Sequence, residues 1–282
     1  MTISKWLSRQ MIAYFKKQVA PNRSYLCDFD RLSHEIRPAD VLLVEGCNRI
    51  SQIINKITKS AWSHSALYIG RIHDIEDPTL RETLHKHYQG APHERLIVES
   101  HIGQGTYIAP LSKYQNDHLR ICRPTGISAK DAQTVISYAI SRIGKQYDVR
   151  QFIDLGRFLL KSRLIPKQMG SSLFKDKSNS TAYEICSEMI ANAFSAIDFP
   201  ILPLIKKDDA HEKFEVIRRN TRMTTPSDFD YSPFFDIIKY PFFQLGQNSQ
   251  YRNLPWNDDE ITHDGEKSIP INPKKANNDK DQ

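Results

Sequence analysis

The sequence predicts an α+β protein in which a run of about five strands precedes the principal helices. Short apolar segments separated by turn residues occupy residues 41–122, and apolar residues at helical spacing dominate 128–143 and 181–197. Because strands and helices are segregated along the chain, an α+β class fits better than alternating β–α units. Short spacers between most of the strands favour antiparallel pairing.

Each element has its own local signal. Compact apolar runs predict strands at 41–44, 65–69, 96–99, 106–109 and 119–122. Helical spacing predicts helices at 49–60, 128–143, 151–165 and 181–197. Ser128 is a suitable N-cap for the second of these, and Gly144 a suitable stop. Polar stretches at 71–94 and 167–180 are predicted to be loops, and prolines from Pro200 onwards predict an irregular region with apolar clusters.

The composition is that of a folded protein with unevenly distributed charge. Of the 282 residues, 26% are charged and 39% hydrophobic, which is too apolar for a wholly disordered chain. Lys and Arg number 39 against 33 Asp and Glu, a net charge of +6. Residues 1–24 carry five basic residues and no acid, whereas 257–282 carry seven acids and four lysines. No basic stripe with interleaved aromatic residues is present, so we expect no nucleic-acid binding.

The cysteines and histidines predict neither a disulfide framework nor a metal centre. The four cysteines, Cys27, Cys47, Cys122 and Cys186, lie far apart with no CxxC pair, which favours reduced thiols. The histidines between 73 and 101 lack the spacing of a zinc site. We therefore expect no metal and no cofactor.

The N-terminal segment predicts neither a signal peptide nor a membrane span. No stretch approaches roughly 20 consecutive apolar residues, and Lys16 and Lys17 fall where the apolar core of a signal peptide would be. We therefore expect a cytoplasmic protein. Residues 3–19 predict an amphipathic helix with aromatic and basic residues. Such a helix either packs on its own domain or makes a peripheral contact with the inner face of a membrane.

Cys186 is the candidate nucleophile. It lies in the predicted helix 181–197 and shares a face with the apolar residues that follow it, so it points toward whatever the helix packs on. A thiol near a helix N-terminus is favoured as the reactive thiolate, although the capping-box spacing of Thr181 and Glu184 would put Cys186 beyond the first turn. The alternative is a small buried apolar residue.

Three further residues are candidates for a thiol hydrolase site. His64 heads the second predicted strand, where an imidazole can take the proton of a neighbouring thiol and return it to a leaving group. Glu99 ends the third strand and would lie beside His64, orienting its ring, if the two strands pair. Tyr147 follows the second predicted helix, and its phenol could donate to a developing oxyanion. Each also has an ordinary interpretation, as a polar edge residue or a half-buried aromatic.

Taken together, these positions resemble a known family. The segments RPADVLLVEG, WSHSALYIG, LIVES, GKQYD and ICSEMI are similar to the circularly permuted branch of the NlpC/P60 papain-like superfamily, specifically the YiiX/YebB-like group. In that branch the histidine and the third polar residue precede the cysteine, as His64 and Glu99 precede Cys186 here. The resemblance covers roughly residues 36–200, and segment 224–235 is similar to the C-terminal part of the family.

The resemblance implies a papain-like fold in which an antiparallel sheet packs against the cysteine helix. It implies the following roles: Cys186 as nucleophile, His64 as general base, Glu99 as the residue that orients His64, and Tyr147 as an oxyanion or substrate donor. The long segments 71–94 and 167–180, and Ile185 in place of an aromatic residue, depart from the family pattern and leave the substrate open.

Three parts of the chain are expected: a basic amphipathic helix at 1–24, a catalytic domain with a C-terminal extension at 36–256, and a disordered polar tail at 257–282. The expected function is a cysteine hydrolase that cleaves amide bonds of small or cell-wall-like peptides through an acyl-enzyme. One alternative is a lipid acyl hydrolase or acyltransferase of the lecithin:retinol-acyltransferase-like kind, which a basic N-terminus would suit. Another is an inactive papain-like binding module.

Overall fold

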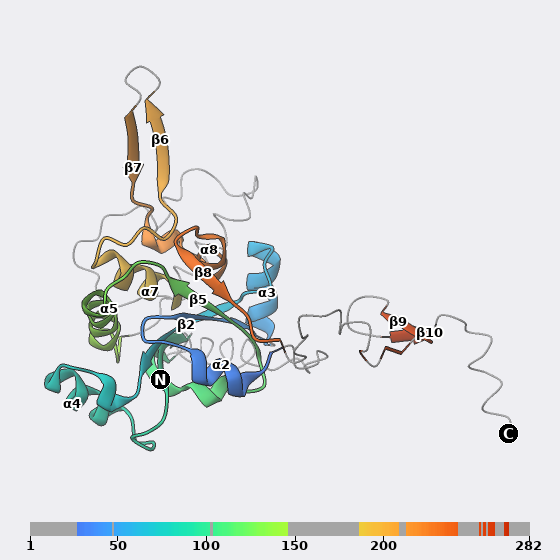
Figure 1. The fold of residues 1–282 in the computed structure, drawn as a ribbon, viewed down its shortest axis with the longest axis horizontal. Helices are drawn as coiled ribbons and strands as arrows, with labels where there is room; N and C mark the ends of the chain where they lie inside the picture. The colour runs from blue at the N-terminus through green and yellow to red at the C-terminus, as the bar shows by residue number, and fades with distance from the viewer. Residues whose placement is uncertain are drawn as a thin grey trace, which may run out of the picture.

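A six-stranded antiparallel sheet forms the centre of the protein (Figure 1). The computed structural model describes residues 27–46, 48–101, 104–145, 186–208, 213–241, 254, 256–257, 259–262 and 268–270. The strand order is β4-β3-β2-β1-β5-β8, and every neighbouring pair is antiparallel. The strands span Val41–Glu45 (β1), His64–Gly70 (β2), Leu96–His101 (β3), Gly105–Pro110 (β4), His118–Pro124 (β5) and Phe235–Ile238 (β8). The five predicted strands and their antiparallel pairing are confirmed.

Helices cover both faces of this sheet. Their bounds are Phe29–Glu35 (α2), Arg49–Thr58 (α3), Pro78–His87 (α4), Ala129–Ser141 (α5), Cys186–Ser195 (α7) and Pro226–Tyr231 (α8). Short 3₁₀ turns span Ile72–Asp74 (η1), Leu111–Tyr114 (η2) and Thr221–Met223 (η4). The predicted helix at 151–165, the loop at 167–180, Cys47 and the N-terminal segment lie outside the described residues.

The two faces of the sheet have separate apolar cores, because strand side chains alternate between them. Helices α5 and α7 pack on one face, against residues such as Leu43, Leu67 and Val98. Helix α2 and turn η2 pack on the other, against residues such as Leu42 and Ile97. Burial on both faces explains why β1 and β2 are continuous apolar runs rather than alternating ones.

Local chemistry fixes where the helices start. The Ser128 hydroxyl accepts from the Asp131 backbone N–H, and Asp131 returns the bond to Ser128, which is a complete capping box for α5. Gly144, with φ at +86°, follows this helix as predicted. Segment 71–94 was predicted to be a loop, but it contains η1 and α4. Asp77 caps α4, Pro78 occupies its first turn, and Leu84 packs into the core, which outweighs the polar composition.

The region after Pro200 is more regular than predicted. It contains β8, which extends the sheet beyond β5, and a hairpin of β6 (Leu204–Asp208) and β7 (Lys213–Ile217). The hairpin projects from the body of the protein (Figure 1), and its apolar side chains are exposed, with Phe214 66% accessible. These strands were not predicted, because each is only four or five residues long and the region contains several prolines.

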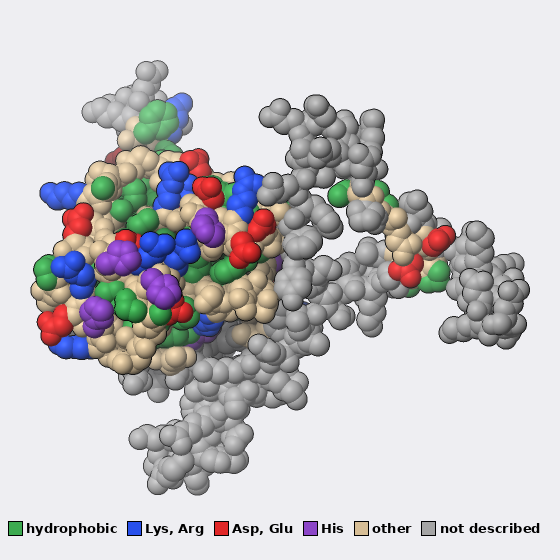
Figure 2. Space-filling view, turned by 60° about the horizontal axis from the view of Figure 1, so that its bottom comes forward, with side chains coloured by type: hydrophobic (Ala, Val, Ile, Leu, Met, Phe, Trp, Pro, Cys, Tyr) green, Lys and Arg blue, Asp and Glu red, His purple; other side chains and the backbone are tan. Residues whose placement is uncertain are grey.

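A short ladder of β9 (Glu260–Thr262) and β10 (Ser268–Pro270) lies within the segment expected to be a disordered tail. The division of the chain at 1–24, 36–256 and 257–282 stays a prediction. Among the described helices, none has both the length and the apolar character needed to cross a bilayer. On the face shown in Figure 2, basic and acidic side chains are interspersed, with histidines between them.

Candidate active site

Strand pairing brings His64 and Glu99 together at one end of the sheet. His64 is the first residue of β2, opposite Val44 of β1, and β2 pairs in turn with β3. The Nε2 atom of His64 lies 2.7 Å from Oε2 of Glu99. The predicted juxtaposition of these two side chains is therefore present. Since Nε2 is engaged by Glu99, Nδ1 is the ring nitrogen left for another partner.

Glu99 is a buried carboxylate surrounded by donors. Its side chain is fully inaccessible to solvent, Lys113 Nζ lies 2.5 Å from Oε1, and Tyr114 donates its hydroxyl to Oε2 at 2.5 Å. His101 Nε2 lies 3.3 Å from Oε2. Burial raises the pKa of Glu99, but hydrogen bonds from His101 and His64, together with the charge of His64, outweigh burial and hold it well below its usual value. Glu99 is therefore ionised at neutral pH.

Cys186 interacts with His64 at this end of the sheet, and its helix packs on the face opposite η2. It is the first described residue of α7, which packs on the sheet through Met189, Ile190 and Phe194, as the shared apolar face predicted. Burial raises the pKa of the thiol, but the charge and hydrogen bond of His64, together with the amide and hydroxyl of Ser65, bring it below its ordinary value of 9.0. The Ser65 hydroxyl is fully buried and has no other partner among the described residues.

The pKa of His64 is raised, whereas that of Cys186 is lowered. Burial alone would lower the pKa of His64, yet Cys186 first and Glu99 second raise it from 6.5 to about 9. The neighbouring His101, whose ring centroid lies 4.3 Å away, has its pKa lowered to about 4 by burial and by the charge of His64. The arrangement thus favours a thiolate–imidazolium pair beside a neutral second histidine.

The other described cysteines contrast with Cys186. Burial raises the pKa of Cys27, whose Sγ donates to the Asp117 carbonyl at 3.3 Å. Burial also raises the pKa of Cys122, which lies in the core with no exposed surface. Among the three cysteines that the structure describes, only Cys186 has its thiolate stabilised.

Two residues of this network were not anticipated from the sequence. Lys113 and Tyr114 belong to the 3₁₀ turn η2, between β4 and β5, where neither period-two nor helical spacing marks them. Their signal is indirect: a lysine and a tyrosine at a strand end can reach the adjacent strand on which Glu99 lies. Tyr147 lies outside the described residues, and its role stays a prediction.

The spacing of His64, Glu99 and His101 also resembles a metal-ligand set. One nitrogen from each histidine and one carboxylate oxygen lie within 4.8 Å of one another. The Lys113 ammonium against the same carboxylate opposes a cation there. The charges therefore fit proton transfer better than metal binding.

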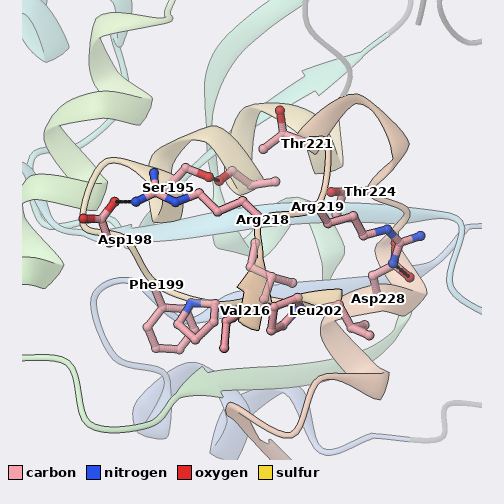
Figure 3. Close-up of a pocket in the computed structure, with 14 residues that line it drawn as sticks. Ser195, Asp198, Phe199, Leu202, Val216, Arg218, Arg219, Thr221, Thr224 and Asp228 are labelled. Atoms are coloured by element: carbon pink, nitrogen blue, oxygen red, sulfur yellow. Dashed lines mark hydrogen bonds and ion pairs between the residues drawn. The ribbon is translucent and has the colours of Figure 1, made fainter. Parts of the chain in front are cut away.

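A cavity of about 160 Å³ lies beside the C-terminal half of α7, where Ala191 and Ser195 line it (Figure 3). Phe199, Leu202 and Val216 form an apolar floor, and two ion pairs flank it. These pairs join Arg218 to Asp198 at 2.6 Å and Arg219 to Asp228 at 3.1 Å. His64, Glu99 and Cys186 do not line this cavity.

Comparison with known proteins gives a match to a family model and similarity to solved structures. Residues 35–154 match the model of a family described as permuted papain-like amidase enzyme, YaeF/YiiX, C92 family. A crystal structure described as the metalloprotein YiiX from Escherichia coli O157:H7 is similar with 14% sequence identity and a TM-score of 0.44. The alignment covers 72% of this chain and 97% of that one. No curated protein matches the chain.

Proposed function

We propose that this chain is a cysteine-dependent amidase, because residues 35–154 match the model of the circularly permuted papain-like family that includes YaeF and YiiX. The family match supports hydrolysis of amides in general. It includes His64 and Glu99 but ends before Cys186, so the assignment of the cysteine rests on its hydrogen bond and charge interaction with His64. The observation that carries the proposal is the convergence of a thiol with a lowered pKa, a histidine with a raised one and a buried carboxylate.

The reaction we propose is acyl transfer through a thioester. The Cys186 thiolate attacks the amide carbonyl, and the resulting oxyanion collapses as the C–N bond breaks. The His64 imidazolium gives its proton to the departing amine, which leaves a neutral imidazole. His64 then takes a proton from water, whose hydroxide attacks the thioester and releases the acid, regenerating the thiolate–imidazolium pair. Glu99 keeps the ring oriented throughout and stabilises its charged form.

For the substrate we propose amides of small or cell-wall-like peptides. This finer assignment rests on the resemblance of the sequence to the permuted papain-like branch. The lipid acyl hydrolase reading is supported only by the basic composition of residues 1–24.

Selective alkylation tests whether Cys186 is a thiolate. At pH 6, iodoacetamide should modify Cys186 at least about tenfold faster than Cys27 or Cys122, because only its pKa is lowered. Peptide mapping by mass spectrometry reports each cysteine separately, including Cys47. The Cys186→Ser variant is the control for assignment of the fast site. If Cys186 reacts no faster than the denatured chain at this pH, the cysteine mechanism is wrong.

Vesicle sedimentation tests the membrane contact on which the proposal of a lipid substrate depends. Peripheral contact through residues 1–24 predicts that the protein sediments with vesicles containing anionic phospholipid and much less with neutral vesicles. Deleting these residues removes five basic side chains and should weaken binding by about tenfold or more. Unchanged sedimentation after the deletion would remove the membrane contact, and with it the support for a lipid substrate.

A further inference from the structure

Asp230 of α8 connects three elements close to His64. Its Oδ2 accepts the indole N–H of Trp62 at 3.2 Å, and Arg120 Nη1 donates to both carboxylate oxygens, at 2.6 and 2.7 Å. The Arg120 guanidinium also lies over the Trp62 ring, 4.6 Å from its centre. Trp62 is only 3% exposed and precedes His64 by two residues. A residue far along the chain therefore holds the start of the histidine strand.

The same segment holds the start of the cysteine helix. Ser187 follows Cys186 directly and is 1% exposed. Its hydroxyl donates to the backbone carbonyl of Thr224 at 2.6 Å. Thr224 and Asp230 both belong to segment 224–235, whose similarity to the family pattern has no role in the acyl-transfer steps above. The segment thus bonds to a near neighbour of His64 and to a near neighbour of Cys186.

Aromatic packing makes this segment a firm support. Phe229 is fully buried and meets Phe235 edge to face, with ring centroids 5.7 Å apart. Phe235 also meets Phe194 of α7 edge to face at 5.4 Å. These contacts fix segment 224–235 against the helix that carries Cys186.

One buried polar atom in this contact lacks a hydrogen-bond partner in the part of the chain that the structure describes. The Nε atom of Arg120 is buried without a partner among the described residues, which costs stability. An apolar contact at this point would avoid that cost. A polar group kept in spite of it is the kind of local conflict expected where geometry serves function.

We propose that Asp230 is a positioning residue, which fixes His64 relative to Cys186 through Trp62 while segment 224–235 holds Cys186 through Ser187. This inference rests on the proposed function. Asp230 touches neither the thiol nor the imidazole in any described contact, so its effect on the reaction is indirect. Ser63 directly precedes His64, and its hydroxyl accepts the Gly46 N–H at 2.9 Å, which is a second contact that fixes this segment.

The test compares Asp230→Ala with Asp228→Ala in the full chain. Asp228 lies in the same helix, where it caps α8 by accepting the Thr225 N–H at 2.7 Å, and it pairs with Arg219. Alkylation of Cys186 by iodoacetamide is followed from pH 5 to 9, with thermal unfolding in parallel. Asp230→Ala should raise the pKa of the thiol by about one unit, so that alkylation at pH 6 slows about tenfold. Asp228→Ala should lower the melting temperature and leave the alkylation profile in place.

Asp230→Asn gives a milder variant in case the alanine variant fails to fold. It keeps an acceptor for Trp62 and should recover part of the lost rate. If the wild-type thiol is reactive at pH 6 and both Asp230 variants keep its profile, the positioning role is wrong while the proposed function stands. If Asp228→Ala shifts the profile as much as Asp230→Ala, the effect is general loosening of α8 and the inference also fails. A wild-type thiol that is unreactive at pH 6 overturns the proposed function and this inference together.

Discussion

Replacing Cys186 with alanine should abolish turnover of peptide amides, by about 10⁴-fold or more, and leave the fold intact. The variant removes the nucleophile, and no other described thiol lies beside an imidazole with a raised pKa. The side chain is only 8% exposed, and its replacement by alanine removes one sulfur atom from a helix held by several buried apolar residues. Hydrolysis of a panel of fluorogenic peptide amides measures the loss, and circular dichroism checks the fold.

Two controls sharpen this experiment. Cys27→Ala removes another buried thiol and should keep full activity, since that thiol only donates to a backbone carbonyl. In Cys186→Ala the pKa of His64, followed by NMR, should fall below about 9, because the largest influences that raise it come from the thiolate. Turnover that survives in Cys186→Ala would contradict the acyl-transfer mechanism.

The second large effect is expected at Glu99. The isosteric change Glu99→Gln should cost about 3–5 kcal/mol of unfolding free energy at pH 7, as removal of one partner from a buried ion pair usually does. The carboxylate is fully buried and is the common acceptor for Lys113, Tyr114 and His64. Turnover should fall by about 10²–10⁴-fold, because His64 loses the group that orients it. Chemical denaturation and amide hydrolysis measure the two effects.

The pKa shifts also predict how the stability lost in Glu99→Gln changes with pH. The pKa of Glu99 is lowered in the folded state, so its contribution is present above the ordinary value of 4.5 and is lost as the pH falls through the folded value. The stability gap between the wild type and Glu99→Gln should therefore narrow below pH 4.5. The pKa of His64 is raised from 6.5 to about 9, so its contribution is full below 6.5 and is lost as the pH rises toward 9. Cys186 has a lowered pKa and partly offsets this loss, because it gives up a proton on folding where His64 takes one up.

Glu45→Gln is the matched control for Glu99→Gln. Glu45 is also buried and lies on the sheet, and its Oε2 is 2.8 Å from His118 Nδ1. Its histidine partner is 28% exposed, so solvent can compensate for much of the lost interaction. The control should lose less stability and keep alkylation of Cys186. Equal losses of turnover in the two variants would show that Glu99 has no special relation to His64.

The part of the site built on regular strands and a helix could be predicted from the sequence. Period-two alternation placed Glu99 on a definite face, and antiparallel pairing brought it to His64. The apolar face of the helix predicted that Cys186 points inward. Lys113 could not be predicted, because it lies on a 3₁₀ turn whose direction depends on the packing of η2 under the sheet.

The fold shows the same division between long and short elements. Strands with a continuous apolar run were predictable, and so was α5 with its N-terminal cap. The hairpin β6–β7 was missed because its strands mix exposed apolar and charged residues, with no buried face to set the pattern. Asp230 was invisible as a functional candidate, since its partners Trp62 and Arg120 are more than 100 residues away.

Four charges in the site, that of Glu99 among them, have a consequence for the whole catalytic cycle. In the resting state the Cys186 thiolate and Glu99 are balanced by protonated His64 and Lys113. In the proposed acyl-enzyme, the thioester and the neutral imidazole leave Glu99 balanced by Lys113 alone. The sum of these charges is zero in both states, so acylation of Cys186 by a neutral amide would draw no counter-ion from solution. The rate of acylation should then depend little on ionic strength, because the charges of the buried site neutralise one another in both states.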